Sequence, residues 1–72
     1  MTSDEIKHKF ANNLRAAMDD ADVSVSYLSS ITGLSRRTIN RYLDGTTLPR
    51  LDDLEILAEA LGVTRYKLLI YT

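Results

Sequence analysis

Arginine is the residue type whose placement in this chain points most directly to chemistry. Residues 36–50 carry four arginines against the single acid Asp44, which leaves the segment with a local charge of +3. A guanidinium group donates two parallel hydrogen bonds, and it fits either a phosphate or the O6 and N7 atoms of guanine. The segment is therefore suited to binding an anion or the edge of a base pair. Its arginines are Arg36, Arg37, Arg41 and Arg50.

Acidic residues flank this basic segment on both sides. Three aspartates lie within residues 19–22, and four acids lie within residues 52–59. The net charge of −1 argues against indiscriminate attraction of nucleic acid, whereas the local polarity suits a protein that presents one face to an anion. Ordinary helix-surface charge gives the same composition, so that alternative stays open.

Residues suited to catalysis or metal binding are scarce. The chain has one histidine and no cysteine, so disulfides and thiolate metal sites are excluded. His8 has no partner at a metal-ligand spacing, and there is no glycine-rich phosphate loop. We therefore expect no enzyme, no metal, no cofactor and no small-molecule substrate.

The elements that must position the arginines are all expected to be helices, because apolar residues recur at helical intervals and nowhere alternate as in a strand. Thr2 and Glu5 have the spacing of a capping box, which predicts a first helix that ends near residues 19–20. Ser24 is expected to cap a short second helix that Gly33 ends, and Ser35 to cap a third over residues 36–43. The expected buried residues of these helices are Ile6, Phe10, Leu14, Ala17, Met18, then Leu28 and Ile31, then Ile39, Tyr42 and Leu43.

Two more helices are expected after the loop at residues 46–49. The fourth has its apolar residues between Leu51 and Leu61 and is closed by Gly62, and Thr64 caps the fifth. The apolar ending at residues 68–71 is either core or a dimer seam. We expect all 72 residues to form one all-α domain. The expected apolar contacts are Leu51, Leu54, Leu57, Ala58 and Leu61 in the fourth helix, and Tyr66, Leu69 and Ile70 in the fifth.

Residues 25–43 have the form of a helix-turn-helix, in which a tight turn at residues 33–35 sets two short helices at a steep angle. The chain resembles the lambda-repressor-like (Cro-type) helix-turn-helix domains in several segments. These are Phe10 and Leu14, "VSVSYLSSITGLSRRTINRYLDG" from Val23 to Gly45, Pro49 four residues later, and "LDDLEILAEALGV" from Leu51 to Val63. The resemblance covers about residues 6–69. It implies a compact five-helix fold whose third helix lies in the DNA major groove.

Three positions depart from the pattern of that family. Val25 stands where the family usually has a glutamine that reaches a phosphate and braces the third helix. Leu43 stands where glutamate is frequent, and Arg50 where serine or threonine is frequent. These departures leave the fold unchanged, but they put the register of the backbone contacts in doubt.

The resemblance and the helical geometry together give a set of DNA-contacting candidates. If Ile39 points inward, a step of about 100° per residue puts Arg37 and Arg41 nearly opposite it. Arg36 is as well placed for a phosphate as for a base, and Arg41 could instead pair with Asp44. The expected base contacts are Arg36, Arg37, Thr38, Asn40 and Arg41.

Contacts to the DNA backbone are expected around the third helix. Hydroxyl groups and exposed N–H groups at helix starts hold phosphate oxygens well, although simple capping would explain the two serines equally. For Arg50, capping and solubility are the alternatives. The expected backbone contacts are Ser24, Ser35, Thr46, Thr47 and Arg50.

These features predict a sequence-specific regulator that binds double-stranded DNA, a repressor of the phage or prophage kind. One such module buries little surface on DNA, so a homodimer on a palindrome is expected. No apolar run is long enough for a membrane span, and a cytoplasmic location is expected. The alternative is a protein-binding module, such as an antitoxin or adaptor, built on the same fold. The sequence leaves open whether the chain is complete or the N-terminal domain of a longer protein.

Overall fold

The computed structural model describes residues 1–69, and its longest element is α1, Ser3–Ala21. The predicted capping box is confirmed, because the Thr2 hydroxyl accepts from the Glu5 N–H and the Glu5 carboxylate accepts from the Thr2 N–H. The predicted end near residues 19–20 is slightly early. The helix continues to Ala21 and stops at Asp22, which takes a left-handed conformation with φ 56°.

The next two helices are α2, Val25–Thr32, and α3, Arg36–Leu43. Their caps are as predicted: the hydroxyls of Ser24 and Ser35 each accept a backbone N–H at 3.1 Å. Gly33 ends α2 with φ 79°, a conformation that glycine adopts without the steric cost of a side chain. Only residues 33–35 separate the two helices.

The chain then forms α4, Leu51–Leu61, and α5, Arg65–Leu69. Gly62 ends α4 as predicted, and the Thr64 hydroxyl accepts from the Lys67 N–H at the start of α5. Among residues 1–69 no strand is present, so the all-α prediction is confirmed. No helix in this part of the chain is long and apolar enough to cross a membrane.

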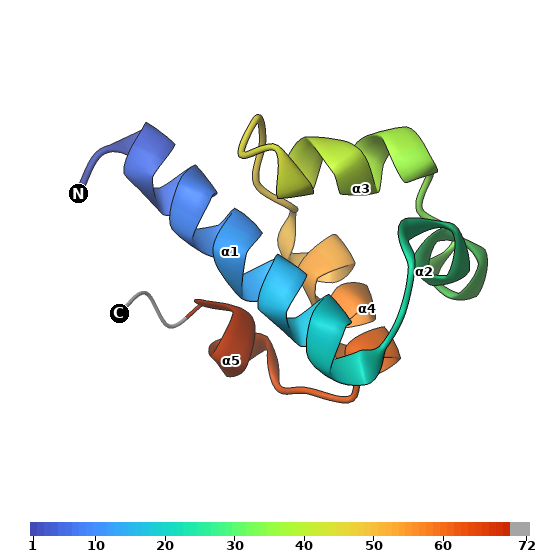
Figure 1. Cartoon of the computed structure of the whole chain (residues 1–72). Helices are drawn as coiled ribbons and strands as arrows, with labels where there is room; N and C mark the ends of the chain where they lie inside the picture. The colour runs from blue at the N-terminus through green and yellow to red at the C-terminus, as the bar shows by residue number, and fades with distance from the viewer. Residues whose placement is uncertain (70–72) are drawn as a thin grey trace.

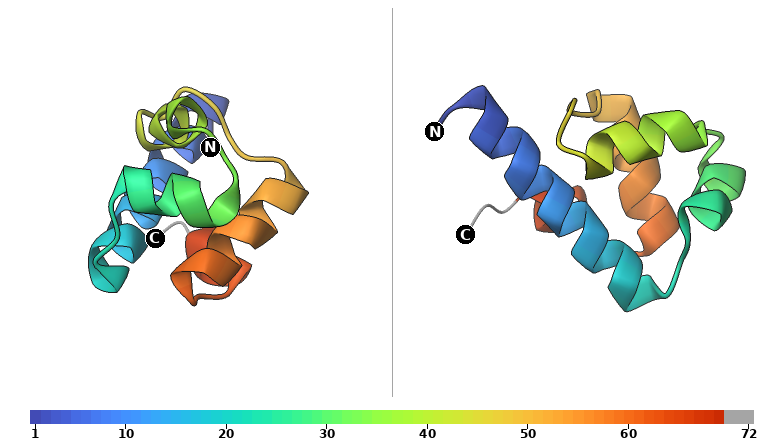
Figure 2. Two further views of the ribbon diagram at one scale, coloured as in Figure 1. Left: turned by 90° about the vertical axis from the view of Figure 1, so that its right-hand side faces the viewer. Right: turned by 45° about the horizontal axis from the view of Figure 1, so that its top comes forward.

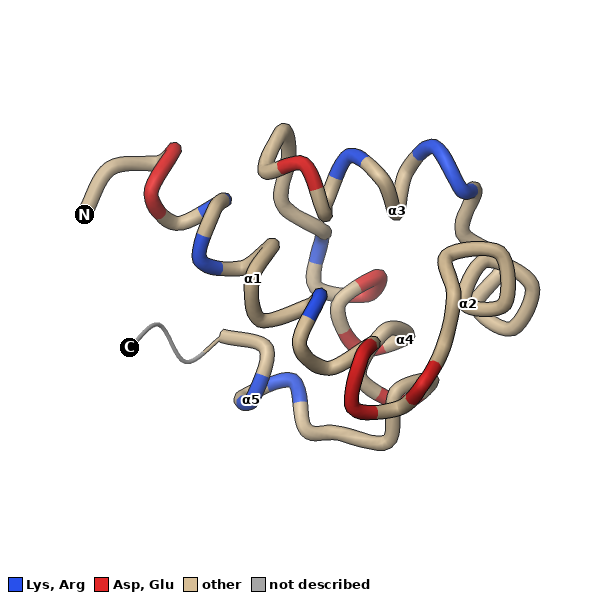
Figure 3. The backbone as a smooth tube through the Cα atoms, viewed as in Figure 1, with Lys and Arg blue, Asp and Glu red and all other residues tan. Residues whose placement is uncertain are grey.

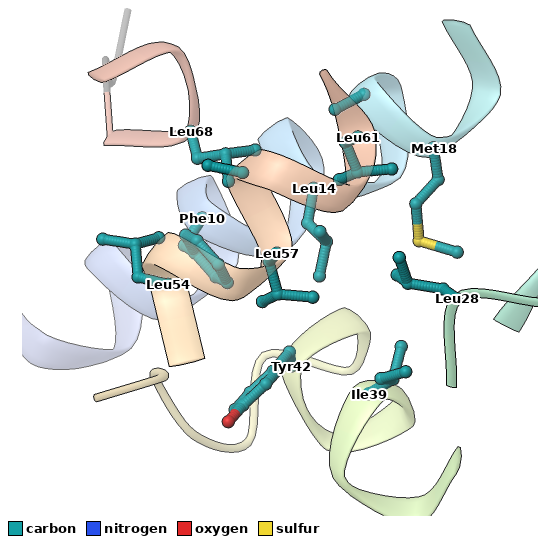
Figure 4. Packing of buried hydrophobic residues seen from close by; sticks show 12 residues of the cluster. Phe10, Leu14, Met18, Leu28, Ile39, Tyr42, Leu54, Leu57, Leu61 and Leu68 are labelled. Carbon is teal, nitrogen blue, oxygen red and sulfur yellow. The ribbon is translucent and has the colours of Figure 1, made fainter. Parts of the chain in front are cut away.

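The five helices surround one core (Figures 1 and 2). α1 packs against α3, α4 and α5, while α2 packs against α3 and α4. Figure 4 shows side chains from every helix meeting in one core, to which α3 contributes Ile39 and Tyr42. The core members are Phe10, Leu14, Ala17, Met18, Leu28, Ile39, Tyr42, Leu54, Leu57, Ala58, Leu61 and Leu68.

Four residues that the sequence predicted to be buried are instead exposed. In α5 the predicted contact Tyr66 is 70% exposed and Leu69 is 39% exposed, whereas Leu68 is fully buried. A helix of five residues touches its neighbours through one position, and Tyr66 lies about 200° around the axis from Leu68. The prediction for Ile70 lies outside the described residues.

The other two corrections fall at the ends of helices. Ile31 is 45% exposed in the last turn of α2, about 60° around the axis from the buried Leu28. Leu51 is 75% exposed although it lies on the same side of α4 as Ala58. As the first residue of α4, it lies beyond the core that the neighbouring helices cover.

Candidate nucleic-acid interface

α3 carries three arginines that face solvent, Arg36, Arg37 and Arg41. Ile39 is fully buried on the side opposite Arg37 and Arg41, as the helical geometry predicts, whereas Arg36 lies in the first turn, about 60° around the axis from Ile39. Figure 3 shows these basic positions along α3 at the upper edge of the molecule. Among residues 1–69 none of the three side chains makes a hydrogen bond or an ion pair, and Arg41 does not pair with Asp44. The guanidinium groups are therefore free to bind an external ligand.

The two polar candidates on α3 differ in their surroundings. Asn40 is exposed beside the arginines, and its side-chain amide is available for hydrogen bonding. Thr38 is half-buried, and its hydroxyl accepts a hydrogen bond from Ser35 Oγ at 2.9 Å. Asn40 thus shares the open face with the arginines, whereas Thr38 belongs to the start of the helix.

Of the predicted backbone contacts, the two serines act as caps in this structure. Ser24 Oγ accepts from the Tyr27 N–H and Ser35 Oγ accepts from the Thr38 N–H. Both residues are exposed, so a phosphate can approach the same helix starts. Their contact with DNA stays a prediction.

The remaining backbone candidates lie in the loop between α3 and α4, which rises beside the end of α3 in Figure 1. Thr46 is exposed and its N–H donates to the Arg41 carbonyl at 3.0 Å, which fastens the loop to α3. Thr47 is half-buried. Arg50 is exposed and precedes α4 as its N-cap residue, without a side-chain capping bond. Its guanidinium group is therefore exposed to solvent and makes no capping bond.

Hydroxyl groups tighten the turn between α2 and α3. Ser29 Oγ donates to the Leu34 carbonyl at 2.6 Å, and Thr32 Oγ1 accepts from the Leu34 N–H at 3.2 Å. Leu34 itself packs against the core. These hydrogen bonds hold the turn between the two helices in place.

Three residues outside the motif, Arg15, Asp53 and His8, contact α3 or the loop that follows it, and their sequence positions do not indicate this role. Arg15 of α1 donates from Nη2 to the Leu43 carbonyl at 3.3 Å. Tyr42 donates from its hydroxyl to Asp53 Oδ2 of α4 at 3.3 Å. The imidazole of His8 lies against Gly45, where it would come within 2.8 Å of an added Cβ atom. Sequence spacing holds no signal for such contacts, because their partners are distant along the chain.

Electrostatic differences across the molecule favour an anion at α3. The C-terminal end of α1, where three aspartates lie within residues 19–22, is at the opposite edge of the molecule from α3 (Figure 3). Burial, with the nearby carboxylate of Asp53, raises the pKa of the Tyr42 hydroxyl, so this group stays neutral and donates a hydrogen bond to Asp53. Among residues 1–69 no group of three or more acids or histidines is arranged to hold a metal ion.

Comparisons with known structures agree on this architecture. An HTH_3 family transcriptional regulator from Vibrio cholerae is similar with a TM-score of 0.85 and 21% identity, over 93% of this chain and 38% of that one. The chain therefore spans less than half the length of that regulator. A hypothetical transcription factor, NHTF, from Neisseria is similar with a TM-score of 0.86 and 26% identity, over 97% of this chain and 79% of that one.

Sequence comparison defines the family. A search of curated proteins gives no match. The helix-turn-helix family model HTH_3, however, matches residues 14–68, which include the whole of α2, α3 and α4. The chain belongs to the HTH_3 helix-turn-helix family.

Proposed function

We propose that this domain is a transcriptional regulator that binds double-stranded DNA in a sequence-specific manner, with α3 in the major groove. The observation that carries the proposal is the set of three exposed, unpaired arginines on α3, above a fully buried Ile39. Membership of the HTH_3 family supports it, as do the two structural neighbours, which are described as a transcriptional regulator and a transcription factor. The role is one of binding and not of catalysis.

The major groove suits these side chains. It admits an α-helix, and it presents guanine O6 and N7 to arginine and adenine N6 and N7 to asparagine. Arg37 and Arg41 are separated by about 6 Å along the helix, close to the rise of two base-pair steps. We therefore expect a half-site with guanines about two steps apart, and phosphates held by Ser24, Ser35, Thr46, Thr47 and Arg50.

In more detail, we propose that the domain is a repressor of the phage or prophage kind and that it acts as a homodimer in the cytoplasm. One module of this size buries only roughly 600–1,000 Å² on DNA, so two copies on a palindrome are needed for tight binding. Exposed apolar residues on α5, Tyr66 and Leu69, are available for contact between copies. Sedimentation equilibrium with and without the selected duplex tests the stoichiometry.

The first experiment is selection of bound duplexes from a random pool, followed by titration of the selected site. We expect a palindromic, guanine-containing site whose affinity falls with rising salt, by about 0.9 log unit per contacted phosphate for each log unit of salt. Replacing the guanines by 7-deazaguanine removes N7 and should weaken binding. Inosine keeps the O6 and N7 acceptors and serves as the matched control.

We predict that Arg37→Ala and Arg41→Ala each weaken specific binding by about 1–3 kcal/mol and relax the preference at one base pair. The reason is the loss of a bidentate pair that the shorter side chain cannot replace. Repeating the selection with each variant identifies the base pair affected. Wild-type behaviour of both variants on selected and random DNA would show that this face does not bind bases.

A protein-binding module on the same fold is the competing hypothesis. It predicts that no sequence is enriched in the selection, and that a second protein co-elutes with the domain from its native cell. A variant in which Arg36, Arg37 and Arg41 are all replaced by alanine separates the two hypotheses. Loss of co-elution in this variant, with no change in DNA binding, would favour the protein-binding alternative.

A further inference from the structure

The end of α3 is held by a donor from a distant part of the chain. A helix leaves its last four carbonyl groups without partners inside the helix. In α3, the carbonyls of residues 40–42 accept backbone N–H groups from within residues 44–46, at 2.8–3.2 Å. The carbonyl of Leu43 instead accepts from the guanidinium group of Arg15 in α1, at 3.3 Å. The polar capping of α3 is therefore completed by α1.

Two contacts of the Tyr42 side chain also hold the C-terminal end of α3. The ring of Tyr42 packs edge-on against Phe10, with centroids 6.3 Å apart, and its hydroxyl donates to Asp53 at the start of α4. Arg15 acts on the main chain of α3 and Asp53 on its inner side chain. Together they connect the C-terminal half of α3 to α1 and to α4.

A small tilt of α3 about this anchored end would displace the side chains at its other end by a large distance. α3 has eight residues and is therefore about 12 Å long. A tilt of about 10° about its C-terminal end would move its N-terminal end by about 2 Å. Hydrogen bonds to base edges tolerate only a few tenths of an ångström around 2.7–3.2 Å, so such a tilt would break them.

We propose that Arg15 and Asp53 are positioning residues, which set the orientation of α3 in the groove and thereby sequence preference without touching DNA. The inference rests on the proposed function. It differs from a simple role in stability, because a misoriented but folded α3 still attracts phosphates and loses only its fit to bases.

The test measures the dissociation constant for the selected duplex and for a random duplex at several salt concentrations. Arg15→Met removes the guanidinium but keeps much of the apolar stem, and Asp53→Ala removes the acceptor. For both we expect affinity for the selected duplex, relative to the random one, to fall about 2- to 30-fold with an unchanged salt slope. Because each variant also changes the net charge, the ratio of the two affinities is the readout.

Matched variants separate positioning from other roles. Arg65→Met removes the same charge from the exposed ion pair with Glu55 and should leave the ratio unchanged. Asp53→Asn keeps an oxygen that can accept from Tyr42, so it should restore the ratio that Asp53→Ala loses. Circular dichroism fixes a temperature at which every variant is fully folded.

Two results would overturn the inference while the proposed function stands. One is an unchanged ratio in folded Arg15→Met and Asp53→Ala. The other is a salt slope for Arg15→Met that is smaller by about 0.9 than that of the wild type, because Arg15 would then be a phosphate ligand. Wild-type protein that prefers no sequence would instead overturn the proposed function itself, and this inference with it.

Discussion

Tyr42 combines burial and polarity within one residue. It is 4% exposed, its ring packs edge-on against Phe10, and its hydroxyl donates to Asp53. Because burial and the neighbouring carboxylate disfavour the tyrosinate form, the pKa of Tyr42 is raised above its ordinary value. The folded state therefore binds this proton more tightly than the unfolded state does.

We predict that this residue makes the free energy of unfolding fall at alkaline pH. The raised pKa stabilises the folded state fully below about pH 10, where the unfolded tyrosine is still neutral. That contribution is lost as the pH rises from about 10 through the pKa of the folded state. Urea unfolding of the wild type and Tyr42→Phe between pH 8 and 11 isolates the effect, since lysines and the other tyrosines titrate in both proteins. Parallel pH profiles would contradict it.

Residues whose partners are local were predictable from sequence, and residues whose partners are distant were not. The caps at Thr2, Ser24 and Ser35 act within three positions of themselves, so residue type and spacing suffice. Arg15 reaches a carbonyl 28 positions away. Nothing in its sequence surroundings distinguishes it from a surface arginine.

At the scale of elements, α1 has an unusual distribution of charge at its end. A helix carries a partial negative charge at its C-terminus, where cations stabilise it. The last turn of α1 has no basic residue, and Asp22 follows it as the C-cap. The first turn, in contrast, has the favourable acids Asp4 and Glu5. The two ends of α1 therefore respond oppositely to loss of a negative charge.

We predict that Asp22→Asn raises the free energy of unfolding by about 0.3–1 kcal/mol at low salt. Asparagine tolerates the left-handed conformation of this position as well as aspartate does, so the change isolates the charge. Asp4→Asn is the matched variant and should lower stability by a similar amount. Urea unfolding at low and high salt measures both. Effects of the same sign, or effects that do not shrink with salt, would argue against the helix dipole.

The predicted elements match the structure where periodicity is long. α1 and α4 show several turns of apolar spacing, and the positions of α2 and α3 follow from the caps. α5 has five residues, which is too short for a pattern to indicate its inner side. The sequence therefore predicted that α5 exists, and it wrongly predicted that Tyr66 and Leu69 are its buried contacts.

At the scale of the whole molecule, α5 closes the core. Leu68 is fully buried in the cluster that all five helices share, and its carbonyl accepts from Asn13 Nδ2 of α1 at 3.0 Å. A chain of this length has a total stability of roughly 4–11 kcal/mol. A single core contact is therefore a large part of what holds the domain together.

We predict that Leu68→Ala lowers the free energy of unfolding by about 2–5 kcal/mol, because it opens a cavity in a small core. Tyr66→Ala, two positions earlier and 70% exposed, should change it by no more than about 0.5 kcal/mol. Thermal and urea unfolding of the two variants measure the difference. Equal losses of stability would mean that α5 does not dock through Leu68.

The basic residues of α3 and the acidic residues at the C-terminal end of α1 lie at opposite edges of the domain (Figure 3). This separation of charge also affects how the domain approaches a polyanion. With a net charge of −1, the molecule as a whole is not drawn to DNA, but the field of the duplex exerts a torque on it. That torque turns the basic edge inward before contact, and collisions through the opposite edge are repelled. Collisions that bring α3 to the DNA are therefore favoured over collisions through the acidic edge. A nearly neutral protein can thus search DNA without binding it through its acidic surface.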